Sequence, residues 1–247
     1  MLKREHYLQA IRAFYETDLI KIITGIRRCG KSVILNQIRD ELAVTTTNIL
    51  YLNFEDRSTT AQITTVQSLL DYVTQKRSPG TCYLFLDEIQ NLTGWSEACK
   101  TLRLQNCSLF ITGSNSKLLS REFTKELSGR YVSFRIRPFV FKEIEAYGKL
   151  LNKEISLMDY PVYGGFPQIF TLPDTDAIRR YLNDLNDTIV INSMKKYTTK
   201  TLPSTQSAAW ITAMMSHTIW KTSCTTNCYT WATPSSYTKT ETMKSTS

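Results

Sequence analysis

The chain has 247 residues, of which 42% are hydrophobic and 21% charged, so it is long enough to bury a sizeable core and has an ordinary globular composition. These values exclude a small disulfide-stapled module, and no apolar run approaches the ~18 residues that a membrane helix needs. The formal net charge of +8 is uneven, because residues 193–247 carry six lysines and one acid, which leaves +3 on residues 1–192. The body of the chain is therefore only mildly basic.

The amino-terminal stretch MLKREHYLQAIRAFYETDL has charges throughout and lacks the apolar segment of a secretory signal. We therefore expect a cytoplasmic protein without membrane association, whose six cysteines are reduced. These cysteines also lack the paired CxxC spacing of a zinc site, so we expect no structural metal.

Residues 19–24, LIKIIT, form a short apolar run that predicts a buried strand. The run leads directly into GIRRCGKS at residues 25–32, which is the GxxxxGKS pattern known as Walker A, and we expect a helix over residues 31–42. Glycines let the backbone fold round a phosphate with its N–H groups pointing inward, and the helix N-terminus adds its positive dipole end. The pattern predicts a phosphate-binding loop.

Two side chains of this loop have expected roles of their own. Lys31 is expected to reach the β- and γ-phosphates of ATP, and the Ser32 hydroxyl to coordinate Mg²⁺. Cys29 lies near the helix N-terminus and Lys31, an environment that lowers a thiol pKa, so it is either a redox-sensitive group or a small tolerated residue. The expected nucleotide-binding positions are Gly25, Ile26, Arg27, Arg28, Cys29, Gly30, Lys31, Ser32 and Val33.

An acidic pair follows a second buried strand, CYLFL at residues 82–86, in the pattern known as Walker B. Asp87 is expected to hold Mg²⁺ through water, and Glu88 to polarise the water that attacks ATP. The alternative is that both carboxylates cap the following turn. Residues 53–56, NFED, come after another strand at 49–52 and either add a carboxylate near the site or form a solvated loop.

Later strands bring further polar candidates. Ser114 and Asn115 follow a strand at residues 108–112 and are expected to contact the γ-phosphate or the attacking water, although Gly-Ser-Asn is also an ordinary turn sequence. Arg130 precedes a strand at residues 131–136 and is a candidate arginine finger, acting in cis or in trans. A surface salt bridge is the alternative for Arg130.

The alternation of strands and helices, typical of an α/β domain, stops near residue 192. Of residues 193–247, 24 are Ser or Thr, Leu202 is the only leucine, and none is glycine. A packed domain needs leucines, turns and periodicity. The segment is therefore either a disordered tail or, since three of the four tryptophans lie in it, a stretch translated in the wrong reading frame.

Several motifs together resemble one family along nearly all of residues 1–192. They are TGIRRCGKS, YLFLDEIQN with Gly94-Trp95, ITGSNSKLLS, LSGRYVSFRIRPFVFKEIEAYG and YPVYGGFPQI. The chain resembles the prokaryotic AAA-type predicted ATPases, whose ATPase core is followed by a domain of unknown function. The resemblance implies an ASCE-type P-loop sheet that is mainly parallel and flanked by helices, then a helical, winged-helix-like region. It also implies the roles given above for Lys31, Ser32, Asp87 and Glu88, a sensor-like pair at Ser114 and Asn115, and Arg130 as the finger.

The same resemblance bears on the tail. Family members end with a segment close to ENxVYNELLxxGYxVxxxxxxxxEIDF. Suppose that each codon of the original reading frame consists of the third base of one codon of the present frame and the first two bases of the next. The genetic code then forces five residues of that segment. The pairs that force them are Trp220-Lys221 (Glu), Asn227-Cys228 and Cys228-Tyr229 (Leu), Trp231-Ala232 (Gly) and Met243-Lys244 (Glu). We therefore hypothesise that this chain is a frameshifted or truncated copy of a member of this family.

The sequence thus predicts a P-loop ATPase domain over residues 1–150, a helical segment that starts a winged-helix-like region over 151–192, and an irregular tail over 193–247. The leading function is ATP binding with Mg²⁺-dependent hydrolysis of the β–γ phosphoanhydride bond. The alternatives are a nucleotide-dependent DNA- or protein-binding module with little hydrolysis, and a non-functional remnant. A homo-oligomer is expected if Arg130 acts in trans.

Overall fold

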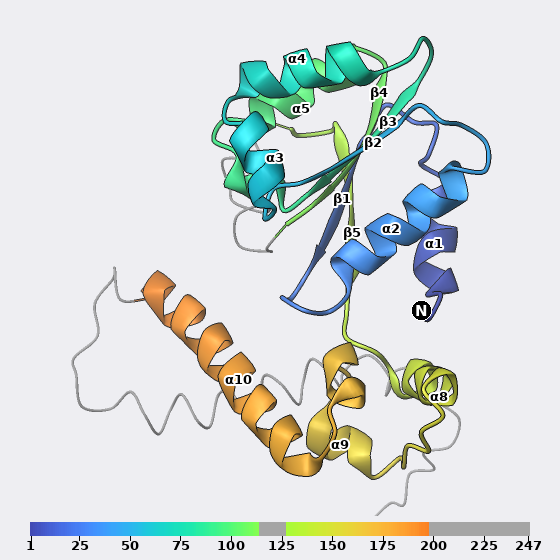
Figure 1. The fold of residues 1–247 in the computed structure, drawn as a ribbon, viewed down its shortest axis with the longest axis vertical. Helices are drawn as coiled ribbons and strands as arrows, with labels where there is room; N and C mark the ends of the chain where they lie inside the picture. The colour runs from blue at the N-terminus through green and yellow to red at the C-terminus, as the bar shows by residue number, and fades with distance from the viewer. Residues whose placement is uncertain (114–126, 198–247) are drawn as a thin grey trace, which may run out of the picture. The chain divides into compact units, whose positions relative to one another are not determined.

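A computed structural model of the chain describes residues 1–113 and 127–197 (Figure 1). The chain divides into two compact units, Met1–Leu182 and Asn183–Ser247. The predictions for residues 198–247, including the irregular tail, lie outside the described residues. The domain boundaries proposed after residues 150 and 192 stay predictions.

The first unit is built on one parallel sheet of five strands in the order β2-β3-β4-β1-β5. The strands are β1 (Ile20–Gly25), β2 (Ile49–Asn53), β3 (Cys82–Asp87), β4 (Cys107–Thr112) and β5 (Tyr131–Ile136). The predicted α/β fold with a mainly parallel sheet is confirmed. The apolar runs form strands because β1, β3 and β4 are buried along their whole length, which is typical of strands covered on both faces.

Helices cover both faces of this sheet (Figure 1). On one face, α1 and α2 contribute apolar side chains that pack with Phe85 and Phe110, two stacked rings whose centroids lie 4.8 Å apart. On the other face, α4 and α5 pack on Leu84 and Leu86. The elements up to this point are α1 (Glu5–Arg12), α2 (Lys31–Leu42), α3 (Arg57–Gln62), α4 (Val66–Lys76), η1 (Ile89–Asn91) and α5 (Trp95–Leu104).

Beyond β5 the described chain is helical, with α8 (Phe141–Leu150), α9 (Asp159–Tyr163), η2 (Pro167–Thr171) and α10 (Thr175–Tyr197). The start of α8 is held by a hydrogen bond from the Phe139 N–H to the Gly165 carbonyl at 2.7 Å. Gly165 is required at this contact, because a Cβ there would lie 1.9 Å from the Phe139 oxygen. Among the described residues, no helix is both long and apolar enough to cross a membrane.

Strand order decides which side chains meet at the carboxyl edge of the sheet. Because β4 lies between β3 and β1, the residues that follow β1 and β3 flank the end of β4. The register pairs Leu86 with Ile111 and Asn53 with Asp87, so Asp87 and Thr112 end their strands at the same level as Asn53. In open parallel sheets, ligands bind at this edge.

Candidate functional site

The loop between β1 and α2 curls back on itself at the carboxyl edge of the sheet. Two of its residues have left-handed backbones, Arg28 with φ 67° and Gly30 with φ 98°, and the Cys29 N–H donates to the Ile26 carbonyl at 3.3 Å. Gly30 begins α2 without any side-chain cap. The first N–H groups of a helix have no acceptor within the helix, so this loop presents donors suited to an anion.

Gly25 is where the loop passes closest to the rest of the sheet. A Cβ at this position would lie 2.4 Å from the Ile136 carbonyl oxygen and 2.6 Å from the Cys29 sulfur. Real Cβ atoms do not approach so closely, so the first glycine of the motif is required by packing between the loop and the end of β5.

Lys31 folds back over the loop and is only 6% exposed. Its Nζ atom donates to the Ile26 carbonyl at 3.5 Å and lies 3.7 Å from the Glu88 Oε1 atom. The cation that follows β1 and the carboxylate that follows β3 therefore lie together. Among the described residues Glu88 is the one carboxylate paired with Lys31, and at 3.7 Å a bound phosphate could take its place.

Asp87 and Glu88 are adjacent in sequence but differ in surroundings. Asp87 is 2% exposed, and its two carboxylate oxygens accept hydrogen bonds from the Tyr51 hydroxyl, at 2.9 Å, and from the Thr112 hydroxyl. Glu88 has a left-handed backbone with φ 54°, and its side chain accepts a hydrogen bond from Gln90. The turn at Glu88 gives the two carboxylates separate partners.

Tyr51 and Thr112 are site residues that the sequence did not reveal. The Thr112 hydroxyl donates to Asp87 and accepts from the Glu88 N–H at 3.0 Å, so one side chain fixes both acidic residues. Burial, and then the neighbouring Asp87, raise the pKa of Tyr51, which keeps its phenol protonated as a donor. Both residues stand near the ends of strands that flank β3, so strand order was the signal needed to find them.

The expectation of a lowered thiol pKa at Cys29 is wrong. The side chain is fully buried, and this burial raises the pKa of Cys29 more than Lys31 and Arg4 lower it. A buried neutral thiol is a poor nucleophile, so the redox-sensitive alternative fails and the small tolerated residue remains.

The loop after β2 is mostly a solvated loop rather than part of the acidic site. Phe54 is buried in the core, and Asp56 caps α3 by accepting from the Ser58 N–H at 3.3 Å. Glu55 lies 3.9 Å from Arg27 of the phosphate loop, but both side chains are more than half exposed. Exposed ion pairs of this kind contribute little to the free energy of folding.

Ser114 and Asn115 lie outside the described residues, so their predicted contacts with the γ-phosphate or the attacking water stay predictions. Arg130 is exposed and directly precedes Tyr131, which pairs with Ile20 at the start of β1, whereas the phosphate loop follows Gly25 at the other end of that strand. Arg130 is therefore at the opposite edge of the sheet, and the cis alternative for the finger is wrong for geometric reasons.

A parallel α/β sheet with a glycine-flanked loop after β1 and an acidic pair after β3 defines the P-loop class of nucleotide-binding folds. Residues 17–145, more than half of the chain, match the model of a family described as AAA domain. The chain belongs to this family.

Two curated relatives are uncharacterized proteins. One, from Haemophilus influenzae, is 39% identical over 209 residues, which cover 78% of this chain and 50% of the relative. The other, MJ1544 of Methanocaldococcus jannaschii, is 32% identical over 182 residues, which cover 69% of this chain and 40% of the relative. The chain thus spans half or less of the length of these relatives.

Solved structures that match are distant in sequence. AMPPCP-bound DnaA from Aquifex aeolicus is 16% identical with a TM-score of 0.47, covering 75% of this chain and 66% of that chain. The replication initiator DnaA bound to AMPPCP and single-stranded DNA is 14% identical with a TM-score of 0.47, covering 72% and 63%.

Proposed function

We propose that the chain binds ATP with Mg²⁺ and hydrolyses the β–γ phosphoanhydride bond. The observation that carries the proposal is the 3.7 Å separation of Lys31 Nζ and Glu88 Oε1. A cation beside the phosphate loop and a carboxylate at the end of the neighbouring acidic strand supply the two charges that hydrolysis needs in one place. One stabilises phosphate oxygens and the other orients water.

The backbone of residues 25–33 would hold the phosphates, with Lys31 on the β- and γ-phosphates. Mg²⁺ suits the donors present, because it prefers oxygen ligands and keeps several waters. The Ser32 hydroxyl would bind it directly and Asp87 through water, since both Asp87 oxygens already accept a hydroxyl hydrogen bond. When bound, the ion would neutralise charge that develops on the phosphates.

Glu88 would act as the general base. Its carboxylate lies beside Lys31. A bound γ-phosphate would draw the Lys31 ammonium toward itself and leave Glu88 to accept a proton from water. Ser114 and Asn115 remain candidates for the γ-phosphate, and Arg130 remains a candidate finger in trans, which would require a homo-oligomer.

The experiment is an equilibrium titration of the full chain with Mg·ATP, with phosphate release followed in the same samples. Lys31→Ala should weaken binding by about 10- to 100-fold, the value of a charge-assisted contact, and abolish release. The matched control is Lys76→Ala, an exposed lysine at the end of α4. Equal binding by wild type and Lys31→Ala would refute the proposal.

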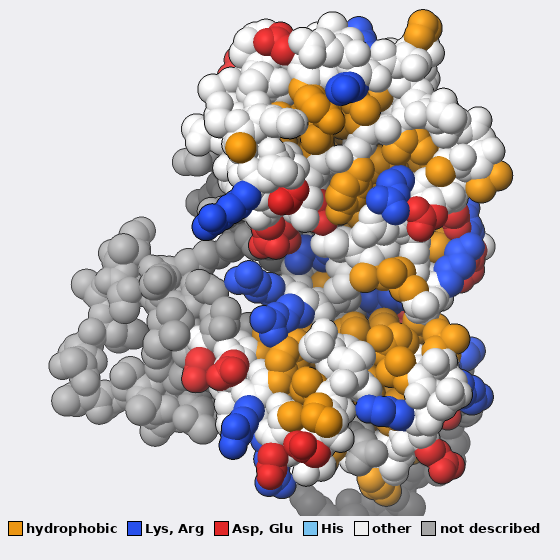
Figure 2. All heavy atoms as spheres, in the orientation of Figure 1, with side chains coloured by type: hydrophobic (Ala, Val, Ile, Leu, Met, Phe, Trp, Pro, Cys, Tyr) orange, Lys and Arg blue, Asp and Glu red, His pale blue; other side chains and the backbone are white. Residues whose placement is uncertain are grey.

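The same titration separates hydrolysis from a nucleotide-dependent binding module. Figure 2 shows acidic and basic side chains interspersed on the viewed face, in keeping with the small charge of residues 1–192. ATP binding without phosphate release, together with salt-dependent DNA affinity, would favour that module.

A further inference from the structure

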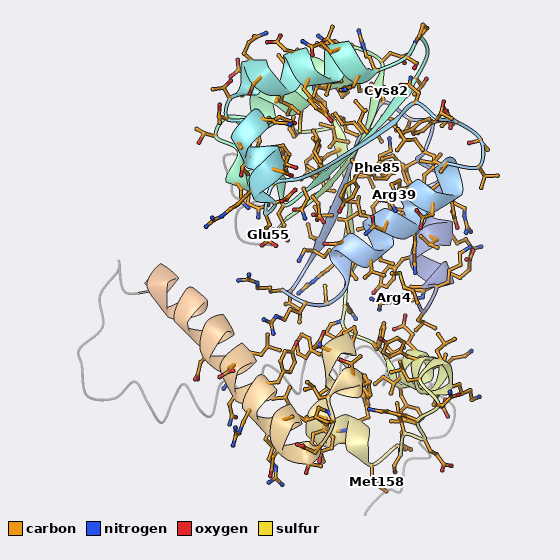
Figure 3. All side chains as sticks on the ribbon, in the orientation of Figure 1. Arg4, Arg39, Glu55, Cys82, Phe85 and Met158 are labelled. Atoms are coloured by element: carbon orange, nitrogen blue, oxygen red, sulfur yellow. The ribbon has the colours of Figure 1, made fainter. Side chains whose placement is uncertain are left out.

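Arg4 is a buried arginine that lies outside every motif of the nucleotide site. It is 3% exposed and lies between α2 and α8 (Figure 3). Its Nε and Nη2 atoms donate to the two carboxylate oxygens of Glu143 at 2.7 and 3.0 Å. Its Nη1 atom donates to the carbonyls of Cys29, at 3.3 Å, and Arg137, at 2.9 Å. One guanidinium therefore joins the phosphate loop, the end of β5 and the first turn of α8.

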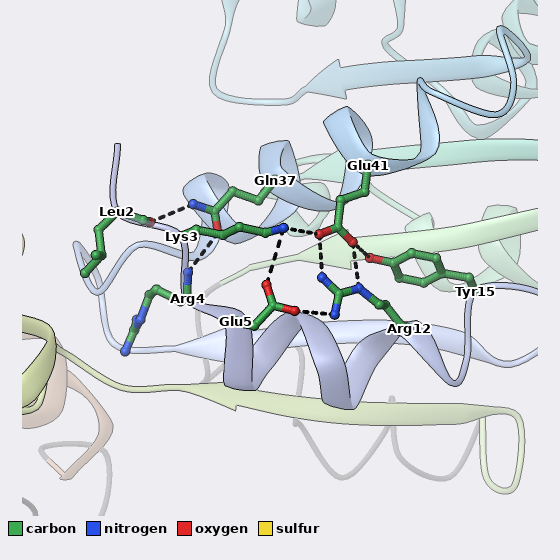
Figure 4. Close-up of polar contacts among 8 residues, drawn as sticks. All are labelled: Leu2, Lys3, Arg4, Glu5, Arg12, Tyr15, Gln37 and Glu41. Carbon is green, nitrogen blue, oxygen red and sulfur yellow. Dashed lines mark hydrogen bonds and ion pairs between the residues drawn. The ribbon is translucent and has the colours of Figure 1, made fainter. Parts of the chain in front are cut away.

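The backbone that carries the Arg4 side chain is held in place by polar contacts to α2 (Figure 4). Gln37 donates to the Leu2 carbonyl at 2.7 Å and accepts from the Arg4 N–H at 3.4 Å. Glu41 pairs with both Lys3 and Arg12. The amino-terminal segment is thereby fastened to the helix that follows the phosphate loop, while the Arg4 guanidinium points away from these contacts.

The partner carboxylate is fixed as well. Glu143 accepts from the Val140 N–H at 2.9 Å and so caps the first turn of α8. The adjacent Phe139 is locked to Gly165, and its ring lies 5.2 Å from the Arg4 guanidinium carbon. Both partners of this bidentate charge pair are therefore held by further hydrogen bonds, Arg4 to two carbonyls and Glu143 to the Val140 N–H.

We infer that Arg4 is a positioning residue that couples the phosphate loop to the segment from Arg137 to Gly165. The coupling rests on the proposed function, because nucleotide is what would reshape the loop that carries the Cys29 carbonyl. Coupling is reciprocal, so a change at Glu143 should alter nucleotide affinity although Glu143 is outside the expected phosphate-binding residues.

The test is hydrogen exchange of the full chain, measured by mass spectrometry with and without Mg·AMPPNP. The variants are Arg4→Lys, which keeps the charge but not the two-pronged geometry, and Glu143→Gln. The matched control is Arg103→Lys, whose pairing with Asp18 lies away from the loop. Without nucleotide, peptides covering residues 25–33 and 139–146 should both exchange about 10-fold faster in the two variants, as expected from the loss of one charge-assisted hydrogen bond.

With nucleotide, the wild-type chain should gain protection from exchange both in the phosphate loop and in α8. The Arg4→Lys variant should still gain protection in the loop but should no longer gain it in α8. Unchanged loop exchange in both variants without nucleotide would overturn the coupling, whether or not ATP binds. Faster exchange throughout, including α4 and α5, would overturn it in favour of a purely structural role. If the wild-type chain binds no nucleotide while the two variants still exchange faster only in the loop and α8, the proposed function is refuted and the coupling stands.

Discussion

Lys31 Nζ and Glu88 Oε1 lie 3.7 Å apart, so the cation proposed to bind phosphate is paired with the carboxylate proposed as the general base. Replacing Glu88 with Gln removes this competitor for Lys31. We predict that Glu88→Gln binds Mg·ATP at least as tightly as the wild-type chain, whereas Lys31→Ala binds it about 10- to 100-fold more weakly. Titration calorimetry measures both constants.

Only the Lys31→Ala substitution is therefore expected to weaken ATP binding. Equal weakening of ATP binding in both variants would contradict the separate roles of cation and base. Lys76→Ala controls for loss of a lysine elsewhere on the surface.

Thr112 fixes both acidic residues through one hydroxyl. Thr112→Val, which keeps the shape of the side chain, should lower the free energy of unfolding by about 1–3 kcal/mol, because a buried carboxylate and an N–H each lose a partner. Tyr51→Phe removes only one hydrogen bond to Asp87 and should cost about 1 kcal/mol. Urea denaturation compares the two, and a larger loss for Tyr51→Phe would contradict the bridging role of Thr112.

Lys21 is fully buried in β1, where its Nζ atom donates to Ser108 at 2.8 Å and to the Thr17 carbonyl at 2.9 Å. Burial lowers the pKa of Lys21 to about 8. In the unfolded chain Lys21 keeps its proton up to about pH 10.5, whereas in the folded chain it loses the proton near pH 8. Between these two pH values the unfolded chain binds more protons. The contribution of Lys21 to the free energy of unfolding therefore rises with pH.

The pH effect is isolated by comparison with Lys21→Met. Relative to that variant, the wild-type free energy of unfolding should rise by about 2 kcal/mol between about pH 7 and pH 10. Denaturation at the two pH values gives this difference directly. If the free energies of unfolding of wild type and Lys21→Met differ by the same amount at both pH values, Lys21 titrates normally in the folded chain.

Much of the fold was predictable because its signals are local. The run LIKIIT followed by GIRRCGKS places a strand, loop and helix without reference to any distant residue. Tyr51 and Thr112 were missed because their contact with Asp87 depends on strand order, which local sequence does not contain. The pKa of Cys29 was misjudged for a related reason, since neighbouring charges are visible in the sequence but complete burial is not.

Arg130 is exposed at the edge of the sheet opposite its own phosphate loop, so any role as a finger must be in trans. We predict that Lys31→Ala and Arg130→Ala chains, each inactive alone, recover phosphate release when mixed, by at least about 10-fold over either one. Recovery requires one chain to supply the loop and another the arginine. Full activity of Arg130→Ala alone would contradict this role.

The reading-frame hypothesis for residues 193–247 is tested on the DNA. The five forced residues follow from the genetic code for any choice of codons, so the test lies in the positions between them, where the shifted frame should encode family-like residues. Sequencing the encoding DNA checks this. Codons that give stop signals or unrelated residues between the forced positions would rule the hypothesis out.

The most direct measurement of the proposed activity is a single-turnover experiment, in which an excess of the full chain is mixed with Mg·ATP and the bound nucleotide is identified over time. Wild-type chain should convert bound ATP to ADP and phosphate, and Glu88→Gln should hold the ATP intact, with a rate lower by about 100-fold or more. Intact ATP on both chains, or equal conversion by both, would contradict hydrolysis by Glu88 at this site.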